Sequence, residues 1–329
     1  MAKVANAFTT YAAKGNREDL SNAIYNIDPF DTPVMSAIKR RNVKNRIFDW
    51  QTEFLPVVDG NNAQQEGFVL VNSAATPTTR LQNCTQISKR DASVTGSQEE
   101  VDAAGKGSEM AHQMALISKV LKSDMEYISC SRQERVDGDD VGPVARKTEA
   151  IPHWIARAVD KLGNTGATST TVQGVLTGLP TASGTAWAAP AGASQVQVTE
   201  QMLNDAMQNA YTNGASPDMW VLPPGPRRTV STFTGRSTTQ VLVGKTEVVS
   251  TVDVIATDFG RIKVMPSRWL PADLALLIDS SYIAMAYFRT FRQVKIATVG
   301  DAETRMIVTE WGIEMRNSLA HQVFNGIKK

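Results

Sequence analysis

The sequence predicts an α+β protein, and three segments carry that prediction. Residues 110–128 place apolar side chains three or four positions apart, which is typical of an amphipathic helix. Residues 219–226 predict a short buried strand, a proline break and a helix that starts at Pro226. Residues 303–317 alternate apolar and polar side chains, as a strand does when one face lies on a core and the other meets solvent.

The N-terminal segment up to residue 46 predicts an arm that lies across another surface. Residues 17–24 fit a short amphipathic helix, and we expect Pro29 and Pro33 to stop any helix that reaches them. The arm ends in a basic patch without a single acid, made of Lys39, Arg40, Arg41, Lys44 and Arg46. A solvated face is the plainer interpretation of this patch, and a contact with phosphate or with an acidic partner is the alternative.

Residues 45–98 predict two extended strands joined by a long excursion, because Gly60, Gly67 and Pro77 interrupt a polar stretch. A loop of this length without helical content is either disordered or functional. A two-stranded ribbon alone is marginal in water, so we expect another chain to bury its apolar side chains. The candidate assembly residues are Trp50, Phe54, Phe68 and Leu70.

The clearest helix of the sequence lies in residues 99–135, which contain no proline. Its apolar stripe is expected to pack on the chain's own sheet, and an adaptable groove for a partner is the alternative. Lys122 and Glu126 are spaced for an ion pair on the exposed side of the helix. The stripe consists of Met110, Met114, Ile117, Leu121, Met125 and Ile128.

Further along the chain, residues 150–162 predict a short helix and residues 163–196 a loop-rich connection. A helix is expected from the N-cap Thr199 to Gly214. Residues 248–267 and 274–289 predict strands with turns at Asp258 and Asp279. In the last strand Ile307, Thr309, Trp311, Ile313 and Met315 share the core face, whereas Glu310, Glu314 and Arg316 are expected to face solvent.

Composition excludes several classes of protein. The net charge is +1 over 329 residues, which argues against a protein whose main task is to wrap nucleic acid. No window contains the apolar run of a membrane span, and no secretion signal is recognised. Cys84 and Cys130 are the only cysteines, so we expect reduced thiols in a cytosolic setting rather than a disulfide framework.

No catalytic, cofactor-binding or metal site is predicted. His112, His153 and His321 lack partners at metal-ligand spacing and are expected to be surface or satisfied core residues. The run at Asp137, Asp139 and Asp140 resembles the start of a calcium loop, but Thr148 stands where the bidentate glutamate would be needed. A hydrolase or an adhesin with an unrecognised site stays an alternative, and it would behave as a monomer or a small oligomer.

Three blocks of sequence resemble the major capsid (major head) proteins of tailed bacteriophages with the Hong Kong 97-type capsid fold. They are "AKGNREDLSNAIYNIDPFDTPVMSAI", "TRLQNCTQISKRDASVTGSQEEVDAAGKGSEMAHQMA" and "VGDAETRMIVTEWGIEMRNSLAH", in the order of the family. The resemblance implies an N-terminal arm at 1–45 and an extended loop at 46–97. It also implies a peripheral domain at 98–196 with a spine helix at 98–135, an axial domain at 197–298, and a C-terminal strand at 299–329 that returns to the peripheral domain.

The resemblance also implies the function and the partners. The chain is expected to self-assemble through pentamers and hexamers into the icosahedral head shell that encloses double-stranded DNA, in the virion after assembly in the bacterial cytoplasm. A separate scaffolding protein and a portal are expected, the DNA contact should be weak and non-specific, and a decoration protein is left open. Some relatives form isopeptide cross-links from a lysine of the loop, but residues 46–88 contain no lysine. A rival with the same fold is an encapsulin-like compartment that holds protein cargo.

Overall fold

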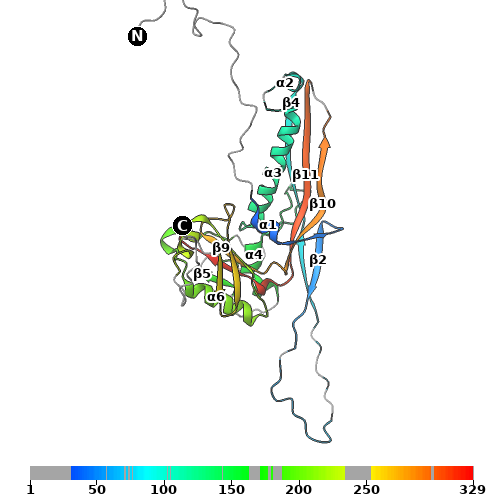
Figure 1. Ribbon diagram of the computed structural model, residues 1–329. Coiled ribbons are helices and arrows are strands. Elements are labelled where there is room, and N and C mark those ends of the chain that lie inside the picture. Colours follow the sequence, from blue (N-terminus) through cyan, green and yellow to red (C-terminus); the bar gives the residue numbers. More distant parts are fainter. Residues whose placement is uncertain are drawn as a thin grey trace, which may run out of the picture.

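The computed structural model describes residues 31–328 except 57, 70–71, 73–74, 76, 102, 104, 143, 163–170, 177–178, 181–186, 234–252 and 298–299. The molecule is elongated. A long helix and long strands run side by side, a compact unit lies beside one end of them, and a loop projects beyond that end (Figure 1). The helix predicted at residues 17–24 lies outside the described residues.

The long part of the molecule is built on a four-stranded sheet of order β1-β10-β11-β4, in which only β1 runs parallel to its neighbour. Strand β11 pairs with β10 on one side and with β4 on the other over nearly its whole length. The bounds are Lys39–Asn42 for β1, Gln86–Thr95 for β4, Ile283–Lys295 for β10 and Ala302–Met315 for β11.

Helix α3 (Glu109–Ser129) lies along one face of this sheet (Figure 1). Its residues Met110, Met114 and Leu121 pack with Val94 of β4 and Ile307 of β11. The stripe therefore packs on the chain's own sheet, as the sequence predicted.

The helix is shorter than the predicted range 98–135, since it has 21 residues and a length of about 32 Å. A separate short helix, α2 (Gly96–Glu100), precedes it. The break has local causes: Gly105 adopts φ +75°, and the Ser108 hydroxyl accepts a hydrogen bond from the Ala111 N–H at 3.2 Å. An N-cap at this position fixes where the helical hydrogen bonds begin.

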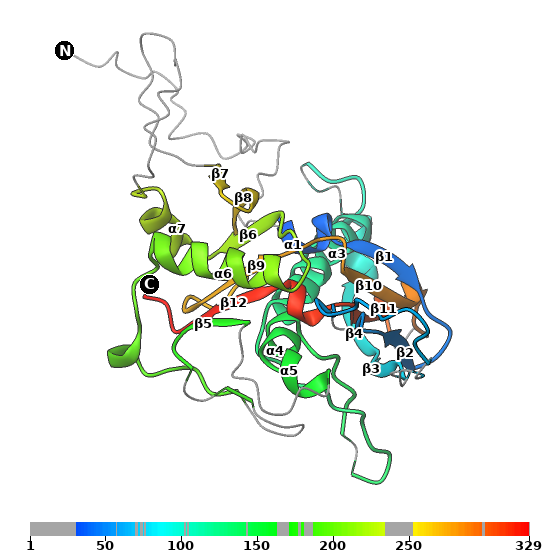
Figure 2. The same cartoon turned by 90° about the horizontal axis from the view of Figure 1, so that it is seen from below.

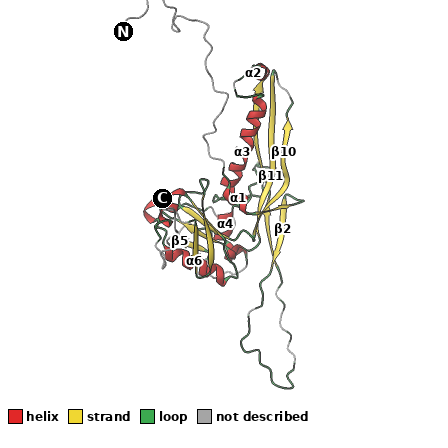
Figure 3. Cartoon of the chain, in the orientation of Figure 1, coloured by secondary structure: helices red, strands yellow, loops and turns green. Residues whose placement is uncertain are grey.

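The compact unit contains a six-stranded mixed sheet of order β5-β12-β9-β6-β8-β7. Helices α4 and α6 gather around this unit, whereas α3 alone spans the long part (Figure 3). The strand bounds are Val172–Gly174 for β5, Met219–Leu222 for β6, Val254–Thr257 for β7, Gly260–Pro266 for β8, Leu274–Ile278 for β9 and Gln322–Asn325 for β12.

Both faces of this sheet are covered, so all five residues of β9 are buried. Figure 2 shows α6 and α7 on one side of the sheet and α4 and α5 on the other. On the first side Leu203 and Met207 of α6 pack with Trp220 and Phe324. The helix bounds are Ile151–Ala156 for α4, Ala158–Lys161 for α5, Glu200–Thr212 for α6 and Pro224–Val230 for α7, with short 3-10 turns at Gly192–Ser194 and Ser318–Ala320.

Most of the predicted local signals are confirmed here. The Thr199 hydroxyl accepts a hydrogen bond from the Met202 N–H at 3.2 Å and caps α6. Turns separate β7 from β8 and β9 from β10 at the predicted aspartates. Helix α7 starts at Pro224 rather than Pro226, and α1 (Pro33–Ala37) starts at Pro33, where a stop was expected. A proline at the first helical position loses no hydrogen bond, which explains both differences.

Three strands pair in a different sheet from the one expected for the predicted domain range that contains them. Strand β10 falls within 197–298 but belongs to the four-stranded sheet, whereas β5 and β12 fall within 98–196 and 299–329 but belong to the six-stranded sheet. Sheet membership depends on pairing with distant strands, and the period of a single strand does not contain that information. The chain therefore passes from the six-stranded sheet to the four-stranded sheet between β9 and β10, and it returns between β11 and β12.

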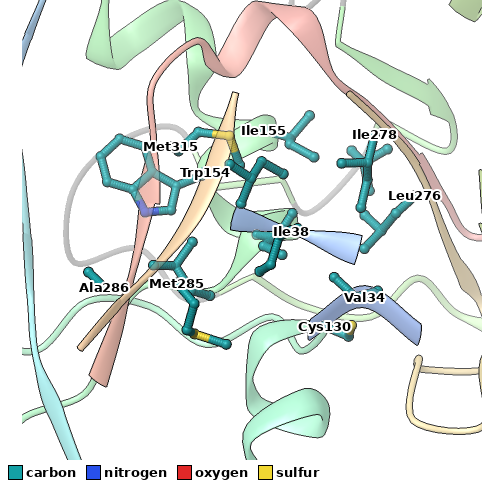
Figure 4. Close-up of a cluster of buried hydrophobic side chains, with 14 of the residues drawn as sticks. Val34, Ile38, Cys130, Trp154, Ile155, Leu276, Ile278, Met285, Ala286 and Met315 are labelled. Atoms are coloured by element: carbon teal, nitrogen blue, oxygen red, sulfur yellow. The ribbon is translucent and has the colours of Figure 1, made fainter. Parts of the chain in front are cut away.

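One hydrophobic core joins the two units. Figure 4 shows Val34 of α1 and Ile38, which directly follows it, beside Leu276 and Ile278 of β9 and Met285 of β10. Trp154 of α4, Cys130 and Met315 belong to the same cluster. Helix α1 thus fills the junction between the long part and the compact unit.

Strands β2 (Ile47–Thr52) and β3 (Thr79–Cys84) form an antiparallel ribbon, which confirms the predicted pair of strands with an excursion between them. The ribbon crosses β11 at Gly312 on the face turned away from α3. A Cβ atom on Gly312 would lie 2.8 Å from a ring carbon of Phe48 and 2.9 Å from the carbonyl oxygen of Cys84. Only glycine lets the ribbon approach this closely.

We expect Gly312→Ala to lower the free energy of unfolding by about 1–3 kcal/mol, because the added methyl group overpacks this crossing. Gly60→Ala is the matched control, since no atom lies within 4 Å of its Cβ position. Urea unfolding of the unassembled subunit measures both. Equal unfolding midpoints for the two variants would show that the ribbon does not press on β11.

Candidate assembly surfaces

The extended loop, here residues 53–78, has exposed apolar side chains at the positions that the structure describes. Phe54 is 54% exposed and Phe68 57%, and Leu55, Val58 and Val69 are more than four-fifths exposed. Leu55 and Val58 were not singled out in the sequence, although the run "FLPVV" carries them. The predicted assembly residue Leu70 lies outside the described residues.

Trp50 does not belong with these residues, so the prediction that another chain buries it is wrong. Its side chain is buried, and its ring lies 5.9 Å from that of Phe48 and 5.3 Å from that of Trp154. Trp50 precedes the point where the loop leaves the ribbon, and α4 covers the ribbon there. The chain's own core therefore takes this indole.

The basic patch forms β1 and the turn after it, at the edge of the four-stranded sheet. The guanidinium of Arg41 donates to the buried carboxylate of Glu314 at 2.5 Å, so one member of the patch has its partner within the chain. The other four, Lys39, Arg40, Lys44 and Arg46, are exposed and form no ion pair with the described residues. Only these four are free to contact another molecule.

Glu310 and Glu314 are buried, which corrects the prediction that they face solvent. Glu310 accepts hydrogen bonds from Thr85 at 2.7 Å, Arg146 at 2.7 Å and Arg289 at 2.8 Å. Glu314 is held by Arg41 and Arg316. The β2–β3 ribbon and the segment Val136–Lys147, closed by two isolated bridges, cover this face of β11. A buried carboxylate is tolerated only with such partners.

Glu126 of α3 is also buried, and it does not pair with Lys122 as predicted. Its two carboxylate oxygens accept the backbone N–H groups of Val34 and Met35, each at 2.8 Å. These N–H groups are unsatisfied at the start of α1, so the carboxylate caps the short helix. Burial raises the pKa of Glu126 to about 7, against the lowering effect of the two hydrogen bonds.

The polar cluster under α4 is structural. Glu149 bonds His153 Nδ1 at 2.7 Å and pairs with Lys161, whose ammonium lies 3.1 Å from the centre of the Trp154 ring. Burial would raise the pKa of Glu149, but His153 and Lys161 together lower it. Burial lowers the pKa of Lys161 to about 8. The Glu149 N–H bonds to Asn83, so the cluster joins α4 and α5 to β3.

The remaining sequence candidates also have structural roles. His321 is buried, and its Nδ1 accepts the Asp279 N–H at 3.0 Å. Burial lowers its pKa to about 3.

Cys84 and Cys130 are free thiols buried in different places. Asp137 pairs with Arg135, and within the described ranges no group of three or more His, Cys, Asp or Glu side chains is arranged to hold a metal ion. No helix of the described part is long and apolar enough to cross a membrane.

The comparisons with known proteins agree with this picture of exposed appendages around a structural core. The family model "SU10 major capsid protein" matches residues 4–328. The chain belongs to the SU10 major capsid protein family. It is 26% identical over 349 residues to the major capsid protein of Escherichia phage Phieco32, and the match covers 96% of each chain.

Solved structures show the same fold. The capsid protein of cyanophage P-SCSP1u superposes with a TM-score of 0.61 at 10% identity, covering 99% of this chain and 97% of that one. The capsid of cyanophage A-1(L) gives 0.61 at 12% identity, covering 98% and 99%. The SrpI encapsulin of Synechococcus elongatus gives 0.53 at 9% identity, covering 98% and 96%.

The fold is therefore the Hong Kong 97-type capsid fold, which phage capsids and encapsulins share. The family decides between a phage capsid and the alternatives raised from the sequence, an encapsulin-like compartment and a hydrolase or adhesin. The chain is a major capsid protein of a phage head shell and not an enzyme. Its place is the capsid of the virion. The predictions of the capsid function and of the α+β fold are confirmed.

We expect Glu310→Gln to cost about 2 kcal/mol of unfolding free energy, because it removes a charged acceptor from buried hydrogen bonds. The matched control is Asp124→Asn, which breaks the more exposed pair with Arg90 at 2.7 Å and should cost less than about 1 kcal/mol. Chemical unfolding measures both variants. Similar losses would mean that the Glu310 network contributes no more than a surface pair.

The stability of the subunit should depend on the protonation of Glu126. Its pKa is about 7 in the folded state and about 4.3 in an unfolded chain, so between these values the native state binds a proton that the unfolded state lacks. Stability from this group therefore falls as pH rises from about 4.5 to 7, by roughly 3 kcal/mol, and changes little above that range.

Glu126→Gln should remove this component, because the amide does not titrate. The measurement is the slope of unfolding free energy against pH between pH 5 and 8, compared between the wild-type protein and the variant. A variant with the wild-type slope would contradict the assignment of the titrating group to Glu126.

Proposed function

We propose that this capsid protein closes the head shell by burying the extended loop of each copy against a neighbouring copy. The exposed apolar side chains of the loop carry the proposal, because no described segment of the chain buries Phe54, Leu55, Val58, Phe68 or Val69. Burying on the order of 500 Å² at about 25 cal/mol per Å² corresponds to roughly 12 kcal/mol before ordering and docking costs. Those costs remove much of it, so a single contact is weak and a closed lattice makes it stable.

The resemblance to the capsid proteins of tailed phages supports the remaining assembly partners. We propose pentamers and hexamers of this chain, a separate scaffolding protein and a portal. Packaged double-stranded DNA would touch the shell only weakly, since a net charge of +1 gives no strong general attraction for phosphate. Lys39, Arg40, Lys44 and Arg46 are the candidates for a local contact with DNA or with an acidic neighbour.

The loop is tested by removing it. Thr52 pairs with Thr79, so an Asn-Gly turn in place of residues 53–78 can close the ribbon without disturbing β2 or β3. We expect the trimmed subunit to keep its circular dichroism and a cooperative melt, and to form no shells in electron micrographs.

Closed shells of normal size from the trimmed subunit would contradict the proposal. Loss of the cooperative melt would show that the loop belongs to the core of the subunit. A matched variant that exchanges only Phe54 and Phe68 for serine keeps the loop length, and it should also fail to assemble if the apolar contact is what matters.

A further inference from the structure

A β-hairpin formed by residues 136–147 projects from the long part beside the ribbon. Two isolated bridges hold its two arms together, with four backbone hydrogen bonds of 2.9–3.1 Å. At its base the Cys84 thiol of β3 donates to the carbonyl oxygens of Val136 at 3.3 Å and Lys147 at 2.9 Å. The guanidinium of Arg146 pairs with a buried carboxylate of β11. The hairpin is therefore an ordered part of the subunit.

The tip of this hairpin is apolar and acidic. Val141 is 93% exposed and Val144 49%. Asp139 and Asp140 are exposed, and neither forms an ion pair with the described residues. The turn is nevertheless ordered, because a carboxylate oxygen of Asp139 accepts the Val141 N–H at 3.0 Å. The tip therefore offers two apolar side chains and two unpaired carboxylates to a partner.

The edge of the four-stranded sheet at β1 has the complementary composition. Strand β1 pairs with β10 only at Ala284–Tyr287, and beyond it Phe288 is 39% exposed and Phe291 37%. The turn after β1 adjoins these rings, since the Val43 N–H donates to the Tyr287 carbonyl at 2.9 Å and the Tyr287 ring lies 6.2 Å from that of Phe291. This edge, called the flank here, carries the two phenylalanines and the four unpaired cations of the basic patch, Lys39, Arg40, Lys44 and Arg46.

The hairpin and the flank of one chain point in different directions. The hairpin projects at the lower edge of Figure 2, whereas β1 points to the right edge, away from the compact unit. No ion pair joins the acids of the tip to the cations of the flank in the part of the chain that the structure describes. Opposite charges on surfaces that also carry apolar groups favour one docking partner and one register. A contact between two different patches is heterologous, so it repeats from copy to copy and can close into rings.

We propose that the tip of the 136–147 hairpin of one copy docks on the flank of a second copy. The two carboxylates of the tip pair with the cations of the flank, and its two valines pack on Phe288 and Phe291. The inference rests on the proposed role of the basic patch in contacting an acidic neighbour, and it names that neighbour. The extended loop takes no part in this contact.

A charge exchange tests the contact. The hairpin variant carries Asp139→Lys and Asp140→Lys, and the flank variant carries Arg40→Glu and Lys44→Glu. Each should lower the yield of empty shells by at least about tenfold, since like charges then meet at the contact. The quadruple variant restores opposite charges in every contact and should recover most of the yield.

Arg228→Glu with Arg261→Glu is the matched control, because both residues are exposed on the compact unit. It should leave the yield of empty shells unchanged. Circular dichroism and melting of each unassembled variant establish that it is folded. Asp140→Lys alone changes only a charge, since Asp140 makes no hydrogen bond or ion pair with the described residues, and it should lower the yield in the same direction.

A hairpin variant that assembles like the control would overturn the proposal, and so would a quadruple variant as poor as the two double variants. A flank variant that forms empty shells normally would overturn it too. If those shells then package less DNA, phosphate is the partner of the four cations. If the trimmed loop still abolishes shells in any of these cases, only the contact of the hairpin fails and the role of the loop stands.

Discussion

The burial of β11 on both faces is the constraint on which the long part of this capsid protein depends. Helix α3 covers one face through Ile307, and the β2–β3 ribbon covers the other at Gly312. Neighbouring strands occupy both edges. In the near half of the strand, Glu310 and Glu314 reach three arginines from other segments of the chain, Arg41, Arg146 and Arg289, and Arg316 directly after β11. The ribbon is thereby fixed in direction, and the loop must leave the molecule at its end.

The same constraint separates the surfaces that the subunit satisfies from those it leaves open. Trp50, Trp154 and the core around α1 are complete within one chain, and the N–H groups at the start of α1 find Glu126. The loop differs, because Phe54, Leu55, Val58, Phe68 and Val69 remain exposed there. A subunit with a complete core and an exposed apolar loop suits a protein that assembles with other copies of itself.

Elements whose signal is local were predictable from the sequence. The stripe from Met110 to Ile128, the Thr199 cap and the alternating side chains of β11 each specify their own structure without knowledge of the rest. Sheet membership was not predictable, because β5, β10 and β12 take partners that are distant in the sequence. The burial of Trp50 was missed for the same reason, since the cover comes from α4.

The carboxylates show where the period of a strand misleads. Alternation places Glu310 and Glu314 opposite the core face. It cannot tell solvent from a second layer, which here comes from the ribbon strands at 47–52 and 79–84 and from the segment that carries Arg146. A signal was present in Gly312, because a glycine within a strand of β-branched and aromatic residues marks the close approach of another backbone. Glu126 was taken for a surface partner of Lys122, since nothing in its own helix indicates that α1 packs there.

Hydrogen–deuterium exchange, compared between unassembled subunits and purified shells, tests the central claim most directly. The account predicts that the amides of residues 53–78 gain protection on assembly, whereas β6 and β9 are equally protected in both states. A loop that exchanges as fast in the shell as in the free subunit would contradict it, because the uncovered surface of each copy would then not be completed by its neighbour.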